Sequence, residues 1–322
     1  MFKIGVQRRL RERRSTAPRI LFITATRIGD AVISTALLSD LLERYPTARF
    51  TVACGPVAAG VFSAMPRLER LILMPKMKWD GHWFKLWAQV LGRRWDLVID
   101  LRGSGTALFL WARQRRILKG GRRPGSRLGQ LADSMGLDPA PLPVTWTAPQ
   151  DRARAAELLP AGVPLIGLGP TANWDGKVWP PERFAALFQQ LRATALPGAR
   201  AVIFAGPGDA EAALARPVLD ALPQAIDLAG RLTLPEAAAC LARLDLFIGN
   251  DSGLMHLAAA AGTPTLGLFG PSPVDEYAPA GRCTSVVVAP GPRAKAPMDG
   301  ITVEAAADAA RSLLENKGQD AA

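Results

Sequence analysis

Short apolar runs separated by longer helical stretches recur along the first half of the chain. Each run holds three to six residues rich in Leu, Ile, Val or Phe, which is the length of a buried strand, and a helical stretch at 31–44 follows the first run. Strands that alternate with helices favour a parallel sheet with right-handed crossovers. The predicted strands are 19–24, 50–54, 71–74, 97–101 and 116–118.

The same alternation begins again after 139–149, a segment with four prolines that is typical of a linker. The second set of predicted strands is 165–168, 201–205, 225–228, 246–248 and 265–269. We therefore predict an α/β protein of two Rossmann-like domains with parallel sheets. The predicted divisions are a tail at 1–18, an N-terminal domain at 19–145, a C-terminal domain at 146–302 and a closing helix at 303–322, for which packing back on the N-terminal domain is one arrangement.

The stretch 249–271 combines a turn and a helix in a way that suits a phosphate. An apolar run ends at Gly-Asn-Asp-Ser-Gly, a helix of small residues follows, and a second apolar run comes after Gly-Thr-Pro. Asp251 or Ser252 can cap the helix, whose first N–H groups and positive dipole end then point out of the turn. His256, one of two histidines, lies about one turn further on. A purely structural turn is the alternative, but it leaves Asn-Asp-Ser beside a histidine unexplained.

Three more loops carry polar residues at the predicted carboxyl ends of strands, where ligands bind in open α/β sheets. Asp30 stands at the start of the first helix, either as an N-cap or as a general base at a cleft between the domains. Lys177 precedes a helix that begins at a Pro-Pro pair, so it is either a solvated loop residue or a group that reaches an anionic ligand. Asp209 and Glu211 follow Gly-Pro-Gly, where an acid can bind a ribose hydroxyl or simply begin a helix.

A dinucleotide-binding fingerprint fits the chain only formally. Gly167, Gly169 and Ala172 match the pattern G-x-G-x-x-A after a predicted strand. However, Asn-Trp-Asp-Gly follows where a helix should begin, and glutamines stand about 20 residues further on, where an acid would bind the ribose. A nicotinamide or flavin enzyme is therefore disfavoured.

Composition narrows the class of protein. With 322 residues, 49% of them hydrophobic and 21% charged, the chain is a folded protein of about two domains. Neither a signal peptide nor an apolar run of the roughly 18–20 residues that a membrane span needs is visible, so we expect a cytoplasmic protein. Three scattered cysteines and two histidines favour neither a disulfide framework nor a zinc site.

The positive charge is concentrated in the first half of the chain. Residues 1–150 hold 25 Lys and Arg against 10 Asp and Glu, whereas residues 151–322 hold 14 against 18. A basic domain suits a phosphorylated substrate, an anionic membrane surface or nucleic acid, and the lack of a nucleic-acid-binding motif ranks nucleic acid last. The tail at 1–18 is either a solvated arm or an anchor for anionic lipid.

A tryptophan-rich segment stands apart from the strands and helices described so far. Trp79, Trp83 and Trp87 have the spacing of one helical face, and lysines and arginines surround them. The segment is predicted to be either a helix that faces the core or a helix that faces a membrane interface, where tryptophan beside lysine is common.

Several motifs occur in a fixed order along the chain. The specific block is Asn-Asp-Ser-Gly-x-x-His at 250–256 with Phe-Gly-Pro at 269–271. Supporting motifs are Ile-Gly-Asp-Ala-Val at 28–32, Lys-x-Trp-Pro at 177–180 with Phe184, and Gly-Pro at 206–207. In this order they resemble glycosyltransferase family 9, the family of ADP-heptose:lipopolysaccharide heptosyltransferases. The resemblance extends from residue 19 to the last helix and omits the tail and the tryptophan segment.

The resemblance implies a GT-B enzyme whose first domain binds the acceptor and whose second domain binds the nucleotide-sugar donor. Inversion at the anomeric carbon without a metal or other cofactor is also implied, with Asp30 as the general base and Lys177 neutralising the departing diphosphate. The implied donor-binding set is Thr171, Asp251, Ser252, Gly253, His256 and either Asp209 or Glu211, where the family usually has a glutamate. We also expect arginines of the basic first half to bind the acceptor, namely Arg27, Arg102, Arg122, Arg123 and Arg127.

We therefore expect transfer of heptose from ADP-heptose to a phosphorylated, lipid-linked core acceptor at the inner face of the inner membrane, with no nucleic-acid partner. The basic first half is consistent with such an acceptor. Another nucleotide sugar, used to build an envelope glycan, keeps the same chemistry and remains an alternative. A non-catalytic nucleotide-sugar binding protein is a third hypothesis, which Asp30 disfavours because a binder needs no base at the cleft.

Overall fold

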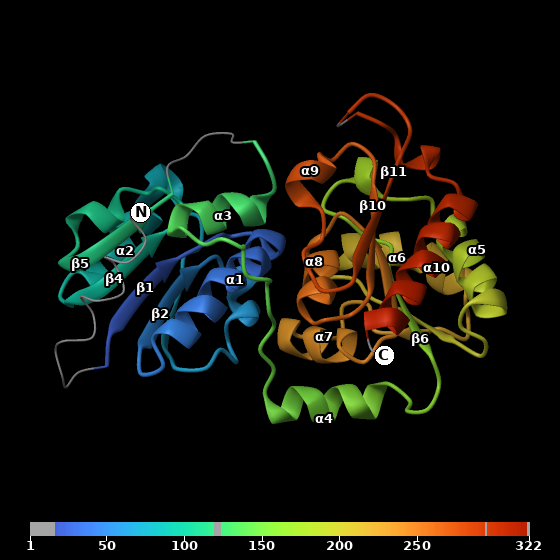
Figure 1. The fold of residues 1–322 in the computed structure, drawn as a ribbon, viewed down its shortest axis with the longest axis horizontal. Coiled ribbons are helices and arrows are strands. Elements are labelled where there is room, and N and C mark those ends of the chain that lie inside the picture. The colour runs from blue at the N-terminus through green and yellow to red at the C-terminus, as the bar shows by residue number, and fades with distance from the viewer. Residues whose placement is uncertain (1–16, 119–123, 294, 321–322) are drawn as a thin grey trace.

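The computed structural model describes residues 17–118, 124–293 and 295–320, which form two α/β domains side by side (Figure 1). The first domain holds a five-stranded parallel sheet in the order β3-β2-β1-β4-β5. Its strands are β1 (Arg19–Ile23), β2 (Arg49–Cys54), β3 (Leu68–Leu73), β4 (Trp95–Asp100) and β5 (Ala112–Ile117). β5 begins before the predicted 116–118, because an edge strand paired only with β4 tolerates the arginines and glutamine that obscured it. The predicted tail, apart from its last two residues, lies outside the described residues.

Different elements cover the two faces of the first sheet. The helices and 3₁₀ turns of this domain are α1 (Ile28–Arg44), η1 (Pro56–Val61), η2 (Lys78–Asp80), α2 (Gly81–Val90), η3 (Thr106–Phe109) and α3 (Arg127–Met135). On one face Ile20 and Phe22 of β1 share a core with α1 and α3. On the other face Leu21 and Ile23 join a smaller core with α2 and η3. This period of two is expected of a parallel strand that is buried on both sides.

The second domain holds a six-stranded parallel sheet in the order β11-β10-β9-β6-β7-β8. Its strands are β6 (Leu165–Gly169), β7 (Arg200–Ile203), β8 (Ile226–Asp227), β9 (Leu246–Asn250), β10 (Thr265–Phe269) and β11 (Thr284–Val288). Its helices and 3₁₀ turns are α4 (Pro149–Leu158), η4 (Asp175–Lys177), α5 (Pro181–Thr194), α6 (Asp209–Ala221), α7 (Leu234–Leu241), α8 (Gly253–Ala260), α9 (Val274–Tyr277), η5 (Met298–Gly300) and α10 (Val303–Asp320). The prediction of two α/β domains with parallel sheets is confirmed, and β11 is an edge strand that the sequence analysis did not predict.

The closing helix packs on the second domain. α10 contacts α5, β10 and β11, and its small residues Ala306, Ala307 and Ala310 are buried in the core of the second sheet. The suggestion that this helix packs back on the N-terminal domain is therefore wrong. The alanine face explains the observed position, because small side chains allow the helix to approach the sheet closely.

The three tryptophans of the tryptophan-rich segment do not lie on one helical face. Trp79 belongs to η2, where its left-handed backbone (φ 56°) separates it from α2, and its side chain is 99% exposed. Trp83 and Trp87 of α2 are half-buried, whereas Leu86 and Val90 form the buried face of that helix. The segment thus both contributes to the core and exposes an aromatic side chain. Within the described ranges, no helix has the length and apolarity to cross a membrane.

The two domains meet where α1 and α8 pack against each other, at the centre of the molecule (Figure 1). Two glycines allow the close approach. A Cβ atom at Gly29 would lie 2.9 Å from Cδ2 of His256, and a Cβ atom at Gly253 would lie 2.9 Å from Cβ of Ile28. Both distances are shorter than carbon atoms can approach without displacement, so each glycine is required by the contact between the domains.

His256 is enclosed in this contact. Its side chain is 4% exposed, and its Nδ1 atom is buried without a hydrogen-bond partner. Burial lowers the pKa of the imidazole below its usual value, an effect that Lys177 reinforces and that the carboxylates of Asp251 and Asp30 oppose. His256 is therefore neutral at physiological pH and contributes packing between the domains rather than a positive charge.

Replacing Gly253 by Ala tests the contact between α1 and α8. The added methyl group must displace Ile28, so we expect the free energy of unfolding to fall by about 1–3 kcal/mol, the usual range for overpacking. Gly92→Ala is the matched control, because a Cβ atom there meets nothing within 4 Å. Denaturant unfolding of both variants measures the difference. Equal stability of the two variants would show that the domains adjust freely at this point.

The buried imidazole predicts a pH dependence of stability. Because the pKa of His256 is lower in the folded protein than in the unfolded chain, the unfolded chain binds an additional proton as the pH falls. The contribution of His256 to the free energy of unfolding is thus complete above about pH 6.5 and is lost as the pH falls below that value. We expect His256→Gln to reduce the loss of melting temperature between about pH 7 and pH 5 relative to the unaltered chain. Identical pH dependence in the two proteins would contradict this assignment.

Candidate active site

A cavity of about 480 Å³ lies between the domains, beyond the carboxyl ends of the central strands of both sheets. Ligands bind at this position in open α/β sheets. The first domain contributes the loop after β1 and the start of α1, and the second domain contributes the loops after β6, β7 and β9. The predicted site residues in its wall are Arg27, Asp30, Thr171, Lys177, Glu211, Asp251, Ser252, Gly253 and His256.

Asp30 supplies the carboxylate of the first domain. It lies in the first turn of α1, where Arg27 holds the N-cap position without a side-chain hydrogen bond, so Asp30 does not act as the cap. Its Oδ1 atom is 3.7 Å from Nε of Arg127, and both side chains are partly exposed. A negative charge here interacts favourably with the helix dipole and with the guanidinium. The carboxylate therefore lines the cavity with a guanidinium beside it.

The start of α8 forms the facing wall in the second domain. Ser252 occupies the N-cap position, but its side chain accepts no capping hydrogen bond, and its Oγ atom is buried without a partner. Asp251 does not cap the helix either, because its Oδ2 atom pairs with Nζ of Lys177 at 2.7 Å. The predicted side-chain cap is thus not formed. The first N–H groups of α8 have no side-chain cap, and such groups bind anionic oxygens well.

A buried tryptophan and a buried asparagine hold Lys177 in place. The backbone N–H of Trp179 donates to Oδ1 of Asn250 at 3.1 Å, and the indole N–H donates to the carbonyl of Ile301 at 3.0 Å. Trp179 also packs edge-to-face on Phe184. Nδ2 of Asn250 donates to the carbonyl of Thr171, so this side chain ties the loop after β6 to the end of β9. Trp179 was part of a recognised sequence motif, but the role of Asn250 in positioning the loop could not be predicted from the sequence.

The structure separates the two acidic candidates after β7. Glu211 lines the cavity, and its Oε2 atom accepts a hydrogen bond from the backbone N–H of Gly206 at 3.0 Å. Asp209 is the first residue of α6, its side chain is exposed, and it is absent from the cavity wall. Of the two carboxylates, Glu211 is therefore the one that a ligand in the cavity can reach.

The arginines predicted to bind the acceptor do not all lie at the cavity. Arg27 lines it, and Arg127 is linked to it through the contact with Asp30. Arg102 is exposed and lies 5.6 Å from the ring of Trp83, away from the cavity wall. Its side chain points toward α2 instead. Arg122 and Arg123 lie outside the described residues.

Tyr277 is a cavity residue that the sequence analysis missed. It ends the short helix α9 and lines the cavity near Asp30 and Arg127. Burial raises the pKa of its phenol, and the nearby Glu276 and Asp30 raise it further. A neutral phenol can donate and accept hydrogen bonds at once. The available signal was that the chain holds only two tyrosines, one of them shortly after Phe-Gly-Pro.

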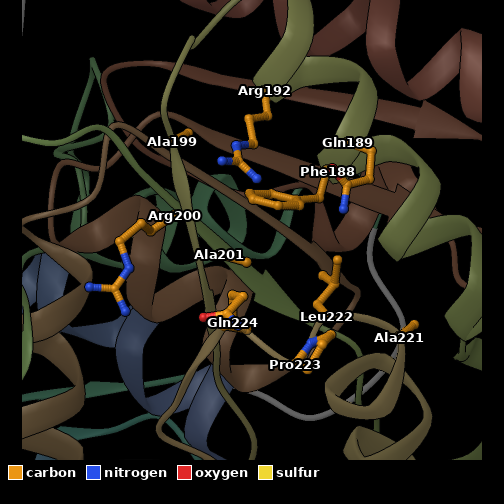
Figure 2. Close-up of a pocket in the computed structure, with 11 residues that line it drawn as sticks. Phe188, Gln189, Arg192, Ala199, Arg200, Ala201, Ala221, Leu222, Pro223 and Gln224 are labelled. Atoms are coloured by element: carbon orange, nitrogen blue, oxygen red, sulfur yellow. The ribbon is translucent and has the colours of Figure 1, made fainter.

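The structure offers no metal site among its described residues and has a second cavity away from the candidate site. Among the described residues, no group of three or more His, Cys, Asp or Glu side chains is arranged to hold a metal ion. A second cavity, of about 350 Å³, lies at the amino ends of β7 and β8, at the opposite edge of the sheet from the site (Figure 2). Figure 2 shows Arg192 and Phe188 on one side of this cavity and Leu222 and Pro223 on the other. None of the predicted site residues lies there.

Comparison with protein families and curated proteins gives consistent matches. The family model of glycosyltransferase family 9 (heptosyltransferase) matches residues 131–299. A lipopolysaccharide heptosyltransferase 3 of Escherichia coli is 26% identical over 277 residues, which cover 75% of this chain and 80% of that protein. A lipopolysaccharide heptosyltransferase 2 of Salmonella typhimurium is 28% identical over 303 residues, which cover 80% of this chain and 84% of that protein.

Solved structures show the same fold. A family 9 glycosyltransferase from Veillonella parvula superposes with a TM-score of 0.78 at 21% identity, over 93% of this chain and 97% of that one. The E. coli ADP-heptose heptosyltransferase II superposes with a TM-score of 0.74 at 24% identity, over 93% and 99%. The fold class is therefore GT-B. Because the family model covers just over half of the sequence, this chain belongs to glycosyltransferase family 9 and is a glycosyltransferase.

Proposed function

We propose that this chain is an inverting, metal-independent glycosyltransferase that moves heptose from ADP-heptose to a lipopolysaccharide core acceptor. One observation carries the proposal. The carboxylate of Asp30 in the first domain shares a cavity with the Lys177–Asp251 pair and the uncapped start of α8 in the second domain. A base and an anion-binding site from different domains are what transfer between two bound substrates needs. The curated relatives named as lipopolysaccharide heptosyltransferases support the choice of sugar and acceptor.

Asp30 is the proposed general base. In this mechanism its carboxylate accepts the proton of the acceptor hydroxyl while the hydroxyl oxygen forms a bond to the anomeric carbon. The bond from that carbon to the diphosphate oxygen breaks, and ADP departs from the opposite face with the electron pair. The anomeric configuration therefore inverts. Arg127 lies beside the carboxylate, with its Nε atom 3.7 Å from Oδ1, and favours the charged form that a base needs.

The start of the second domain's helix α8 is the proposed diphosphate site. Lys177 carries a positive charge to this point, and the N–H groups of Ser252 and Gly253 add donors along the helix dipole. Asp251 holds the ammonium group at 2.7 Å and thereby fixes its direction before a donor binds. These groups stabilise the negative charge that grows on the diphosphate as the bond breaks, which is the role that a metal ion fills in other transferases.

The remaining donor-binding residues take smaller parts in the proposal. Glu211 is placed to accept hydrogen bonds from ribose hydroxyls, and Thr171 is a buried residue of the same wall. His256 was expected to hold the sugar and phosphates directly. Its burial and neutral state favour a supporting role, with Nε2 4.0 Å from Oδ1 of Asp251. It lies beside that carboxylate and packs between the domains.

The positive charge of the first half of the chain supports the proposed acceptor and the proposed place of action. The basic first half of the chain suits an acceptor that carries phosphates and is anchored in an anionic membrane leaflet. Arg27 at the cavity is the proposed first contact with those phosphates, and Arg122 and Arg123 remain candidates from the sequence alone. A cytoplasmic enzyme that acts on such an acceptor needs only peripheral attraction to the inner face of the inner membrane.

Replacing Asp30 by Asn tests the base. The amide cannot accept the proton, so we expect transfer to slow by about 10²–10⁴-fold while calorimetry shows unchanged donor binding. Asp133→Asn, an exposed carboxylate on α3, is the matched control and should leave the rate unchanged. Transfer at the unaltered rate in the Asp30 variant would remove this residue from the mechanism. Loss of donor binding would assign it to the donor site instead.

Replacing Glu211 by Gln tests the ribose site. A hydrogen bond to a charged group is worth about 1.5–3 kcal/mol, so the affinity for ADP-heptose should fall roughly 10–100-fold. Asp209→Asn removes a carboxylate two residues away that is absent from the cavity wall, and it should leave the affinity unchanged. The reverse pattern, with Asp209 essential and Glu211 dispensable, would refute the assignment.

A further inference from the structure

Large apolar side chains are exposed on the outer face of the first domain. Trp79 is 99% exposed, Phe109 is 73% exposed, and Trp111 is 69% exposed, although these residue types are normally buried at least in part. Phe84 and Leu108 add two more exposed side chains. Nothing in the proposed transfer reaction uses them, because all five lie outside the cavity wall.

The exposed side chains belong to neighbouring elements. Ala107 and Leu110 of the η3 loop share a small buried core with Leu86 and Val90 of α2, so the helix and the loop pack together. η2, with Trp79, directly precedes α2 and contacts it. Leu108 and Phe109 stand between the two buried loop residues and face outward. The residues thus belong to elements that contact one another, in the part of the domain where Figure 1 shows α2 beside the edge strand β5.

Arg115 maintains the exposed shape of the η3 loop. Its guanidinium donates hydrogen bonds to the backbone carbonyls of Ala107 at 2.9 Å and Ala112 at 3.1 Å, and also to the carbonyl of Leu110. Three bonds from one planar group fix the loop from its inner side. The outward direction of Leu108 and Phe109 is therefore built into the fold.

Basic side chains are interleaved with the aromatic ones. Arg94 lies 5.2 Å from the ring centre of Trp111, and Arg102 lies 5.6 Å from that of Trp83, both within the range of a cation–π contact. Lys76, Lys78 and Lys85 are exposed on and beside η2 and α2, where Asp80 is the one exposed acid from residue 76 to residue 94. We call the exposed set the aromatic–basic surface, which comprises Lys76, Lys78, Trp79, Phe84, Lys85, Arg94, Leu108, Phe109 and Trp111.

We propose that the aromatic–basic surface binds the headgroup region of an anionic lipid bilayer. Tryptophan and phenylalanine insert into the boundary between headgroups and acyl chains, and lysine and arginine pair with lipid phosphates beside them. The choice of a bilayer rests on the proposed function, because an enzyme with a lipid-linked acceptor must work at such a surface. The surface belongs to the first domain, which is the proposed acceptor domain.

Charge disfavours a second copy of the chain as the occupant. Two aromatic–basic surfaces placed face to face would oppose lysines and arginines to one another, and such like-charge contacts cost free energy. An anionic bilayer instead neutralises them. Each basic residue near the membrane surface contributes to binding, and the exposed apolar side chains add a contribution that salt does not screen.

Vesicle binding by the full-length chain tests the surface. The apolar variant combines Trp79→Ser, Phe109→Ser and Trp111→Ser, and the charge variant combines Lys76→Gln and Lys85→Gln. Val163→Ser with Val288→Ser, exposed apolar residues of the second domain, is the matched control. On vesicles of phosphatidylcholine with phosphatidylglycerol, we expect binding to weaken at least about tenfold in the apolar variant. It should weaken about fivefold per lysine in the charge variant, and the control should bind like the unaltered chain.

A second readout separates this surface from the basic tail. Lipids brominated on their acyl chains should quench tryptophan fluorescence of the unaltered chain, and Trp79→Phe with Trp111→Phe should reduce the quenching without abolishing binding. Unchanged vesicle binding in the apolar variant would overturn the proposal. So would a change of oligomeric state in that variant without a change in vesicle binding, because the surface would then be a subunit interface.

Transfer of heptose to a deacylated, soluble acceptor separates this proposal from the proposed function. Both the proposed function and the membrane surface are supported if the unaltered chain and the apolar variant transfer heptose equally well. The variant must at the same time bind vesicles more weakly than the unaltered chain. Transfer without any binding of the unaltered chain to vesicles overturns the membrane surface alone. Vesicle binding through this surface without transfer overturns the proposed function alone.

Discussion

The contact between the first turns of α1 and α8 is the constraint on which the rest of the site depends. Gly29 and Gly253 let the two helices approach until each glycine touches a side chain of the other helix, His256 or Ile28. Both helices begin at this point, so their positive ends converge on one cavity. The contact therefore brings Asp30 into one cavity with the proposed anion-binding site, which is encoded more than two hundred residues later in the sequence. Any side chain at either glycine would push α1 and α8 apart, and Asp30 would then lie further from the start of α8.

Local patterns predicted the fold and most of the residues that line the candidate site, because strand ends, glycine turns and helix starts are local features. The sequence could not show that Lys177 pairs with Asp251, or that Asn250 holds the loop on both sides of Lys177, because these contacts join segments over 70 residues apart. The sequence also predicted a side-chain cap on α8, but the carboxylate of Asp251 pairs with Lys177 instead. The helical spacing predicted that Trp79 shares a helical face with Trp83 and Trp87. This prediction is wrong, because the left-handed backbone of Trp79 interrupts the helix.

The two domains carry their charged side chains in different arrangements. The second domain presents one lysine, uncapped amides and a carboxylate in a confined wall, which suits a single diphosphate. The first domain spreads its positive charge over an outer surface, where arginines lie against tryptophan rings. A concentrated charge favours one small ligand, whereas a distributed charge with apolar residues favours an extended one. In this account the donor is held by the first arrangement and the acceptor's membrane is approached by the second.

The central claim is that the cavity transfers heptose from ADP-heptose with inversion and without a metal ion. The most direct measurement is the reaction of the full-length chain with ADP-heptose and a deacylated core acceptor in the presence of a chelator, followed by NMR of the new glycosidic bond. The account predicts release of ADP that requires the acceptor, undiminished by the chelator, and a product of opposite anomeric configuration to the donor. Retained configuration, or turnover that the chelator abolishes, would contradict it.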